Sequence, residues 1–172
     1  KGIGALILKP EIALQPLQFG GGQEQGLRPG TLPVPLIIGL AKAAESALTD
    51  REERSDRLQR LRNQLWQGLQ QALPGVVLNG ALAPRLPHNL NITVMGVNGN
   101  RLQSKLRSRL QCSSGSACSA GRPSHVLRAL GRSQDEAGAS LRLSLGRTTT
   151  AADINGAIAV IKEVVNSLSN ED

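Results

Sequence analysis

Hydrophobic residues recur at three- and four-residue steps in several stretches of the chain, and this spacing predicts helices. The longest series runs through 50–73, where leucines at positions 58, 61, 65 and 69 share one face. The final helix is the best marked, because Thr150 and Asp153 have the spacing of a capping box ahead of a regular series of Ile, Val and Leu. The predicted helices cover residues 34–48, 50–73, 99–110, a stretch from 124, and 151–168.

Short runs rich in Val, Ile and Leu, or alternating between apolar and polar residues, predict strands. The first of them, 3–8, is followed by a Lys9-Pro10 turn and a second extended stretch, which together predict a hairpin at a sheet edge. Between this hairpin and the first helix lies a glycine-rich loop, 20–31, in which no regular element is expected. The remaining predicted strands cover residues 76–78, 89–95, 110–112 and 140–146.

The order of these elements predicts an α/β fold in two parts. From position 76 onward it reads β, β, α, β, α, β, α, without an internal repeat. Composition changes from Ala- and Ile-rich to charge-rich near Thr49 to Arg51, so the expected domains are 1–49 and 50–172.

Composition and charge narrow the classes of function. Of 172 residues, 40% are hydrophobic and 19% charged, which fits a soluble globular protein. The net charge of +7 is spread among leucines on amphipathic stretches, and the aromatic residues are Phe19 and Trp66, so we expect no nucleic-acid partner. The sequence lacks both a run of about 18 apolar residues and an export signal; we therefore expect no membrane partner and a cytoplasmic location.

The two cysteines lie in different surroundings. Cys112 ends a strand-like run and is expected to be a small buried hydrophobe. Cys118 lies between Ser, Gly and Ala residues that form neither a helix nor a packed strand, so its thiol is expected to be exposed. A surface thiol without a role is one interpretation, and a disulfide between the two cysteines is disfavoured in the cytoplasm. Two cysteines and the distant His88 and His125 do not make a metal site.

Three motifs resemble one known family. The stretches "SSGSACSAGRPSHVLRALG", "SLRLSLGR" and "GGGQEQGLRPGT" occur in the order and at the spacing of the cysteine desulfurases, which are pyridoxal-phosphate enzymes of the class V aminotransferase family. The similarity extends over essentially the whole chain. It implies the end of a PLP fold-type-I large domain, followed by a smaller α/β C-terminal domain.

The resemblance also implies roles for three residues. Cys118 matches the nucleophile, whose thiolate takes sulfur from L-cysteine as a persulfide and leaves alanine; a flexible tether suits a thiol that must also reach an acceptor. Arg142 matches the arginine that binds the substrate carboxylate, a task suited to a planar guanidinium, although a surface ion pair is the simpler interpretation. Thr31 matches the threonine whose hydroxyl reaches the cofactor phosphate of the other subunit in a homodimer, although a glycine-rich loop is more often only a turn.

Further expectations come from the same resemblance. Lys1 matches a turn lysine, so the Schiff-base lysine is expected to lie outside this chain, and the N-terminal part of the enzyme is an expected partner. The other expected partners are the homodimer mate and a sulfur-acceptor or iron–sulfur scaffold protein. Gln25 and Pro29 depart from the family's pattern, and the loop after Cys118 is about two residues shorter than in the long-loop members. The alternatives are a selenocysteine lyase or desulfinase-like member, and a cofactor-free thiol or persulfide carrier.

Overall fold

The computed structural model describes residues 2–113 and 124–170. The chain divides into two compact units, Lys1–Arg51 and Glu52–Asp172. The prediction of two functional domains stays a prediction.

The first unit contains the helix that the sequence predicts and lacks the predicted hairpin. Helix α1 is Val34–Thr49, with Pro35 in its first turn, where a missing N–H costs nothing. The Lys9-Pro10 turn is present, since the Ile12 amide donates to the Lys9 carbonyl over 3.0 Å, but residues 2–19 form no strand. The hairpin prediction is therefore wrong for this chain. Two strands alone are marginally stable, and residues 2–51 supply no third strand to pair with them.

The glycine-rich loop contains a short turn that the sequence did not predict. Its element η1, Gln23–Gly26, has left-handed backbone at Glu24 (φ 50°), Gln25 (φ 57°) and Gly26 (φ 79°). Left-handed backbone at residues other than glycine is costly and is typical of functional or strained loops. The loop is thus held in a specific conformation.

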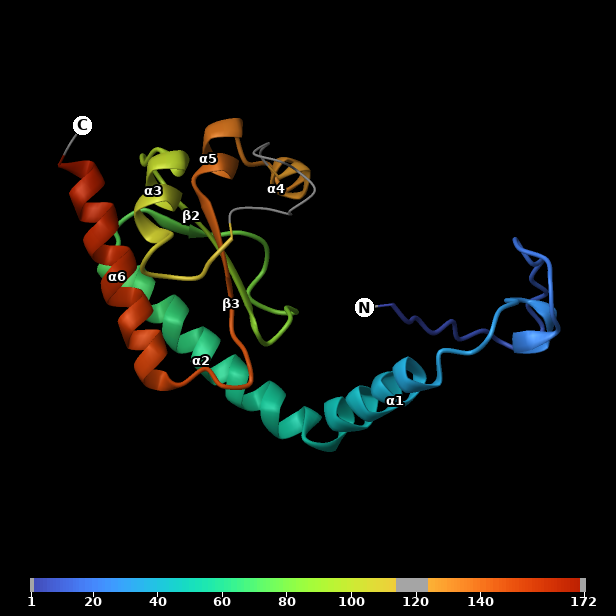
Figure 1. The fold of residues 1–172 in the computed structure, drawn as a ribbon. Helices are drawn as coiled ribbons and strands as arrows, with labels where there is room; N and C mark the ends of the chain where they lie inside the picture. Colours follow the sequence, from blue (N-terminus) through green and yellow to red (C-terminus); the bar gives the residue numbers. More distant parts are fainter. Residues whose placement is uncertain (1, 114–123, 171–172) are drawn as a thin grey trace. The chain divides into compact units, whose positions relative to one another are not determined.

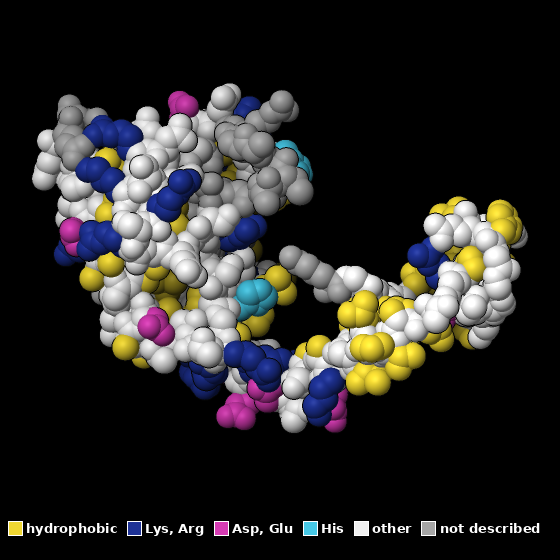
Figure 2. Space-filling view, in the orientation of Figure 1, with side chains coloured by type: hydrophobic (Ala, Val, Ile, Leu, Met, Phe, Trp, Pro, Cys, Tyr) yellow, Lys and Arg dark blue, Asp and Glu magenta, His cyan; other side chains and the backbone are white. Residues whose placement is uncertain are grey.

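Helix α1 exposes an apolar surface. None of its residues is buried, and Figure 2 shows yellow side chains gathered over it. Val34, Ile38 and Leu48 are each more than half exposed. The first unit therefore does not bury its own hydrophobic residues.

The second unit is an antiparallel sheet with helices against it (Figure 1). The sheet order is β1-β2-β3, so β2 is central and pairs with both of its neighbours. The three strands are β1 Val76–Leu78, β2 Asn89–Val94 and β3 Ser140–Ser144. The helices are α2 Arg51–Ala72, α3 Gly99–Leu106, α4 His125–Ala129, α5 Gln134–Gly138 and α6 Ala151–Ser169. None of the helices in 2–113 and 124–170 is long and apolar enough to cross a membrane.

The alternation along the strands gives the sheet two different faces. Leu90 and Ile92 of β2, with Leu141 and Leu143 of β3, belong to one core cluster with residues of α2, α3 and α6. Successive side chains of a strand point to opposite faces, so the intervening Asn91, Thr93, Ser140 and Arg142 lie on the other face. Arg142 thus belongs to the polar face, and the helices α2, α3 and α6 cover the apolar one.

Two predictions about elements of this unit are wrong. Residues 110–112 form no strand; the chain instead makes a single bridge at Ser113 with β3. Helix α5 was not predicted because it is one turn long, although its signal is in the sequence. Ser133 and Glu136 form a reciprocal capping box at its start, as Thr150 and Asp153 do at the start of α6.

Arg62 differs from the other basic residues of α2, because it is the one that the structure buries. Its side chain is 3% exposed. The guanidinium donates to the Leu86 carbonyl over 3.1 Å and to the Asn63 side chain, so its donors are satisfied inside the unit. The pKa of Arg85 is lowered by burial of its side chain and by the positive charge of Arg62.

A buried asparagine, Asn79, forms hydrogen bonds with side chains on the polar face of the sheet. Asn79 is 4% exposed, and its amide nitrogen donates to Asn91 over 2.7 Å and to Thr93 over 2.9 Å. Its side-chain Oδ1 accepts from the Arg132 Nε over 2.7 Å. Since Arg132 also donates to the Leu78 carbonyl over 3.0 Å, this network ties the segment after α4 to the end of β1.

We expect Asn79→Ala to destabilise the second unit by about 2–4 kcal/mol, because it leaves several buried polar groups without partners. Urea denaturation of the chain measures this loss. The exposed Asn100 provides the matched control, and Asn100→Ala should change the free energy of unfolding by less than about 0.5 kcal/mol. Equal effects of the two substitutions would contradict the role assigned to the network.

Candidate active site

Arg142 lies on the polar face of the sheet, near the middle of β3. It is exposed, whereas the neighbouring Leu141 and Leu143 are buried on the opposite face. Across the sheet it pairs with Asn91 of β2 on one side and with Ser113 on the other. Residues directly opposite each other in antiparallel strands share a face, so two uncharged side chains flank the guanidinium.

The contacts of Arg142 leave its charge available. Its Nη2 donates to the Ser113 Oγ over 3.3 Å. Among residues 2–113 and 124–170, no carboxylate forms an ion pair with it, whereas Arg109 pairs with Glu163 over 2.6 Å. A guanidinium has five donors in a fixed fork, so Arg142 can bind a carboxylate or phosphate in bidentate fashion. The alternative of a surface ion pair is not found in the described part of the chain.

The described residues on either side of Cys118 have defined hydrogen bonds. Before it, Ser113 forms its bridge with Arg142, and after it the Ser124 hydroxyl accepts from the Leu127 amide over 3.4 Å at the start of α4. Cys118 itself lies outside the described residues. Its predicted role therefore stays a prediction.

Cys112 is described, and it is a free thiol. It is half-buried and packs against the core cluster, so the prediction of a small hydrophobe in the core is confirmed in part. Burial raises the pKa of its thiol, which favours the thiol over the nucleophilic thiolate.

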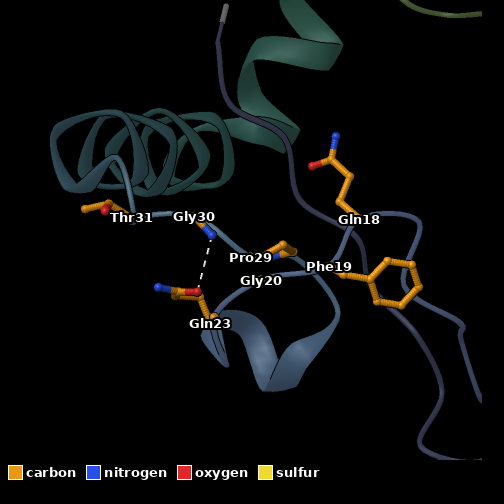
Figure 3. Close-up of a pocket in the computed structure, with 8 residues that line it drawn as sticks. Gln18, Phe19, Gly20, Gln23, Pro29, Gly30 and Thr31 are labelled. Carbon is orange, nitrogen blue, oxygen red and sulfur yellow. Dashed lines mark hydrogen bonds between the residues drawn. The ribbon is translucent and has the colours of Figure 1, made fainter.

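Thr31 lies in the first unit, at the edge of an open hollow of about 690 Å³ (Figure 3). The hollow is formed by the glycine-rich loop. In Figure 3 the dashed line joins Gln23 to Gly30, whose amide donates to the Gln23 Oε1 over 3.2 Å. The lining residues are Gln18, Phe19, Gly20, Gly21, Gln23, Pro29, Gly30 and Thr31.

The residues of this hollow fit a phosphate group. A Cβ at Gly20 would lie 3.0 Å from the Cβ of Pro29, and one at Gly21 would collide with the Gln23 side chain. Gly20 is therefore closely packed against Pro29, whereas the side chain of Gln23 could move away from a residue larger than Gly21. The glycines 20–22 are exposed in the same loop as the Thr31 hydroxyl. Exposed amides next to a hydroxyl are suited to phosphate oxygens. Arg28 donates to the Gln18 side chain, so it holds the loop to the segment before it.

Sequence reasoning predicted Arg142 and Thr31 as site residues, and it did not single out the neighbours of Arg142. Asn91 alternates with leucine and isoleucine in "NLNI", a signal that places it on the polar face. Ser113 was grouped with the loop that follows, and a single bridge leaves no pattern that identifies it. In the described residues, no group of His, Cys, Asp or Glu could hold a metal ion.

The fold and the two sites define a class of protein. The family model for aminotransferase class V matches residues 1–156. The chain belongs to this family, whose members in general depend on pyridoxal phosphate.

Curated relatives narrow the comparison. The chain is 45% identical over 172 residues to the cysteine desulfurase IscS of Methylococcus capsulatus, covering 98% of this chain. It is 44% identical over 168 residues to an IscS-like cysteine desulfurase of Mycobacterium tuberculosis, covering 95% of this chain. These matches confirm the predicted family resemblance. The chain spans only 42% and 43% of the length of these two relatives.

Solved structures give the same result for the fold. A NifS-like protein superposes with a TM-score of 0.80 at 30% identity, over 94% of this chain and 41% of that one. A NifS-like protein from Rickettsia africae superposes with a TM-score of 0.78 at 28% identity, over 90% of this chain and 41% of that one. The predicted α/β fold of the PLP fold-type-I kind is thereby confirmed.

Proposed function

We propose that this chain is part of a pyridoxal-phosphate-dependent cysteine desulfurase, an enzyme that converts L-cysteine to alanine and transfers its sulfur to Cys118. The observation that carries the proposal is Arg142. It is an exposed guanidinium without a carboxylate partner in the described residues, bridged to the segment that leads to Cys118. The 45% identity to an IscS cysteine desulfurase supports the same function.

In this proposal each residue has one task. Arg142 binds the carboxylate of L-cysteine and fixes the direction of its sulfur. The Cys118 thiolate attacks that sulfur; a sulfur–sulfur bond forms while the substrate's carbon–sulfur bond breaks. The electron pair of the broken bond stays with the substrate carbon, which takes up a proton and leaves as alanine. Pyridoxal phosphate, when bound, supplies the electron sink that makes this carbon reactive.

The cofactor requires groups beyond those described. We propose that Thr31 and the glycine-rich loop hold its phosphate across a homodimer interface, and that the Schiff-base lysine comes from a part of the enzyme outside these 172 residues. The hollow beside Thr31 supports the first point. The greater length of the curated relatives supports the second, since the chain spans 42% of the first of them.

The exposed apolar surface of the first unit and the fate of the persulfide indicate the remaining partners. The exposed apolar residues of α1 and of the segment before it would be costly in water, so we propose that the N-terminal part of the enzyme or the homodimer mate covers them. A persulfide must be passed on, which calls for a sulfur-acceptor protein such as an iron–sulfur scaffold. A reactive thiol must also stay reduced, and this favours the cytoplasm.

The test is turnover by the complete enzyme that carries this chain. With pyridoxal phosphate and L-cysteine it should release alanine and sulfide in the presence of a reductant. A cofactor-free thiol carrier would release neither. A selenocysteine lyase would release selenium from selenocysteine and leave L-cysteine almost unchanged, so the ratio of the two rates separates this alternative from the desulfurase.

Thr31→Ala should weaken cofactor binding about 10- to 150-fold, because it removes one hydrogen bond to a charged phosphate while the loop backbone remains. The measurement is the dissociation constant of pyridoxal phosphate, obtained from the absorbance of the complete enzyme. Thr31→Ser keeps the hydroxyl and should restore binding. An unchanged affinity in Thr31→Ala would show that the phosphate is held elsewhere.

A further inference from the structure

Ser113 and Arg142 are joined both through their main chains and through their side chains. The Ser113 amide donates to the Arg142 carbonyl over 3.1 Å, and the Arg142 amide donates to the Ser113 carbonyl over 2.6 Å. This is a hydrogen-bonded pair of an antiparallel bridge, in which the two side chains lie on the same face. The Arg142 Nη2 then donates to the Ser113 Oγ over 3.3 Å.

An exposed arginine needs such a contact to act as a binding group. Its side chain carries roughly 2 kcal/mol of rotamer entropy, which a free guanidinium loses when it binds a ligand. A hydroxyl that accepts from Nη2 fixes the guanidinium in advance. A carboxylate in place of the hydroxyl would fix the guanidinium equally well. It would also neutralise the positive charge of Arg142 and compete with an anionic ligand for the guanidinium.

The neighbours of Arg142 across the sheet are uncharged, so they do not neutralise its guanidinium. Asn91 is uncharged and already accepts from the Asn79 amide over 2.7 Å, and Ser113 is uncharged as well. Within the described residues, the Ser113 Oγ is the side-chain atom that receives a hydrogen bond from Arg142. The orientation of the guanidinium therefore depends on Ser113.

We propose that Ser113 is a positioning residue, which orients the Arg142 guanidinium for the substrate carboxylate through its Oγ. This rests on the proposed function of Arg142. Ser113 does not touch the substrate, so its loss should act on carboxylate binding and leave the chemical step unchanged.

The experiment compares Ser113→Ala, Ser113→Thr and Ser144→Ala in the complete enzyme. Ser144 is the matched control, because it is an exposed serine on β3, the strand of Arg142, and lies on the same face as Arg142. Ser113→Ala should raise KM for L-cysteine about 3- to 10-fold with kcat nearly unchanged, which is the range expected for one hydrogen bond. Ser113→Thr keeps the hydroxyl and should give KM close to that of the wild type, as should Ser144→Ala.

Two further readouts separate positioning from a structural role. Cysteamine is the analogue of L-cysteine without its carboxylate, and its inhibition constant should be the same in Ser113→Ala and in the wild type. In an Arg142→Ala background, Ser113→Ala should add nothing, because the group that it positions is absent.

Failures of the two proposals are distinguishable. A raised KM in Arg142→Ala together with an unchanged KM in Ser113→Ala would overturn the positioning role alone. An effect of Ser113→Ala that extends to cysteamine, or that persists without Arg142, would show a structural role and overturn it as well. An unchanged KM in Arg142→Ala would overturn the proposed carboxylate site and the positioning role with it.

Discussion

Replacing Cys118 with serine in the complete enzyme should abolish sulfur transfer while leaving L-cysteine binding intact. A serine hydroxyl is almost wholly protonated at neutral pH and attacks sulfur far less readily than a thiolate. The expected loss in the rate of alanine formation is at least about 100-fold, in line with the removal of a nucleophile from other enzymes. The measurement is the alanine released from L-cysteine, together with KM or the binding constant of the substrate.

Cys112→Ser is the matched control for this prediction. Cys112 is a free thiol packed against the core, and burial raises its pKa. Its replacement should cost about 1 kcal/mol of stability and leave the rate of desulfuration unchanged. A Cys118→Ser enzyme with the wild-type rate would remove Cys118 from the mechanism, and a Cys112→Ser enzyme that lost activity would point to the other thiol.

Arg142→Ala should lower kcat/KM for L-cysteine by about 30- to 1000-fold, mostly through KM. Removing a charge-assisted, bidentate contact to a carboxylate costs on the order of 2–4 kcal/mol. Arg142→Lys keeps the charge but not the planar fork and should fall between alanine and the wild type. Steady-state kinetics with L-cysteine measure these differences.

The control for Arg142 is an arginine that the proposal does not use. Arg107 is exposed and follows the last residue of α3, so Arg107→Ala should leave KM unchanged. The proposal is contradicted by an unchanged KM in Arg142→Ala, or by an equal rise in Arg107→Ala. The second outcome would mean that general positive charge, rather than one guanidinium, attracts the substrate.

The helices could be predicted from sequence because their apolar faces decide where they pack. The leucines of α2 and the Ile, Val and Leu series of α6 belong to the core, and both the start of α1 at Val34 and the capping box at Thr150 were predicted at the residues where the structure has them. In β3 the alternation was sufficient to place Arg142 opposite the buried Leu141 and Leu143. These signals depend on residues that are close together in the chain, so a single sequence is enough to recognise them.

The errors concern contacts between distant segments. The extended stretch 3–8 reads as a strand, but a strand forms only with a partner, which its own composition does not specify. Arg62 reads as a surface charge on an amphipathic helix, and only the Leu86 carbonyl, 24 positions further along the chain, explains its burial. Ser113 is one serine among several until its bridge to Arg142 is seen.

The most direct test of the proposed function is to locate the transferred sulfur atom after a single turnover. The complete enzyme is mixed with one equivalent of L-cysteine without reductant, digested with trypsin and analysed by mass spectrometry. Because no Lys or Arg lies between the two cysteines, both fall on one peptide, and its fragments show which of them carries the sulfur. The account predicts one added sulfur atom on Cys118 and an unmodified Cys112, with an equal amount of alanine formed. Alanine without added sulfur on Cys118, or sulfur on Cys112 instead, would contradict it.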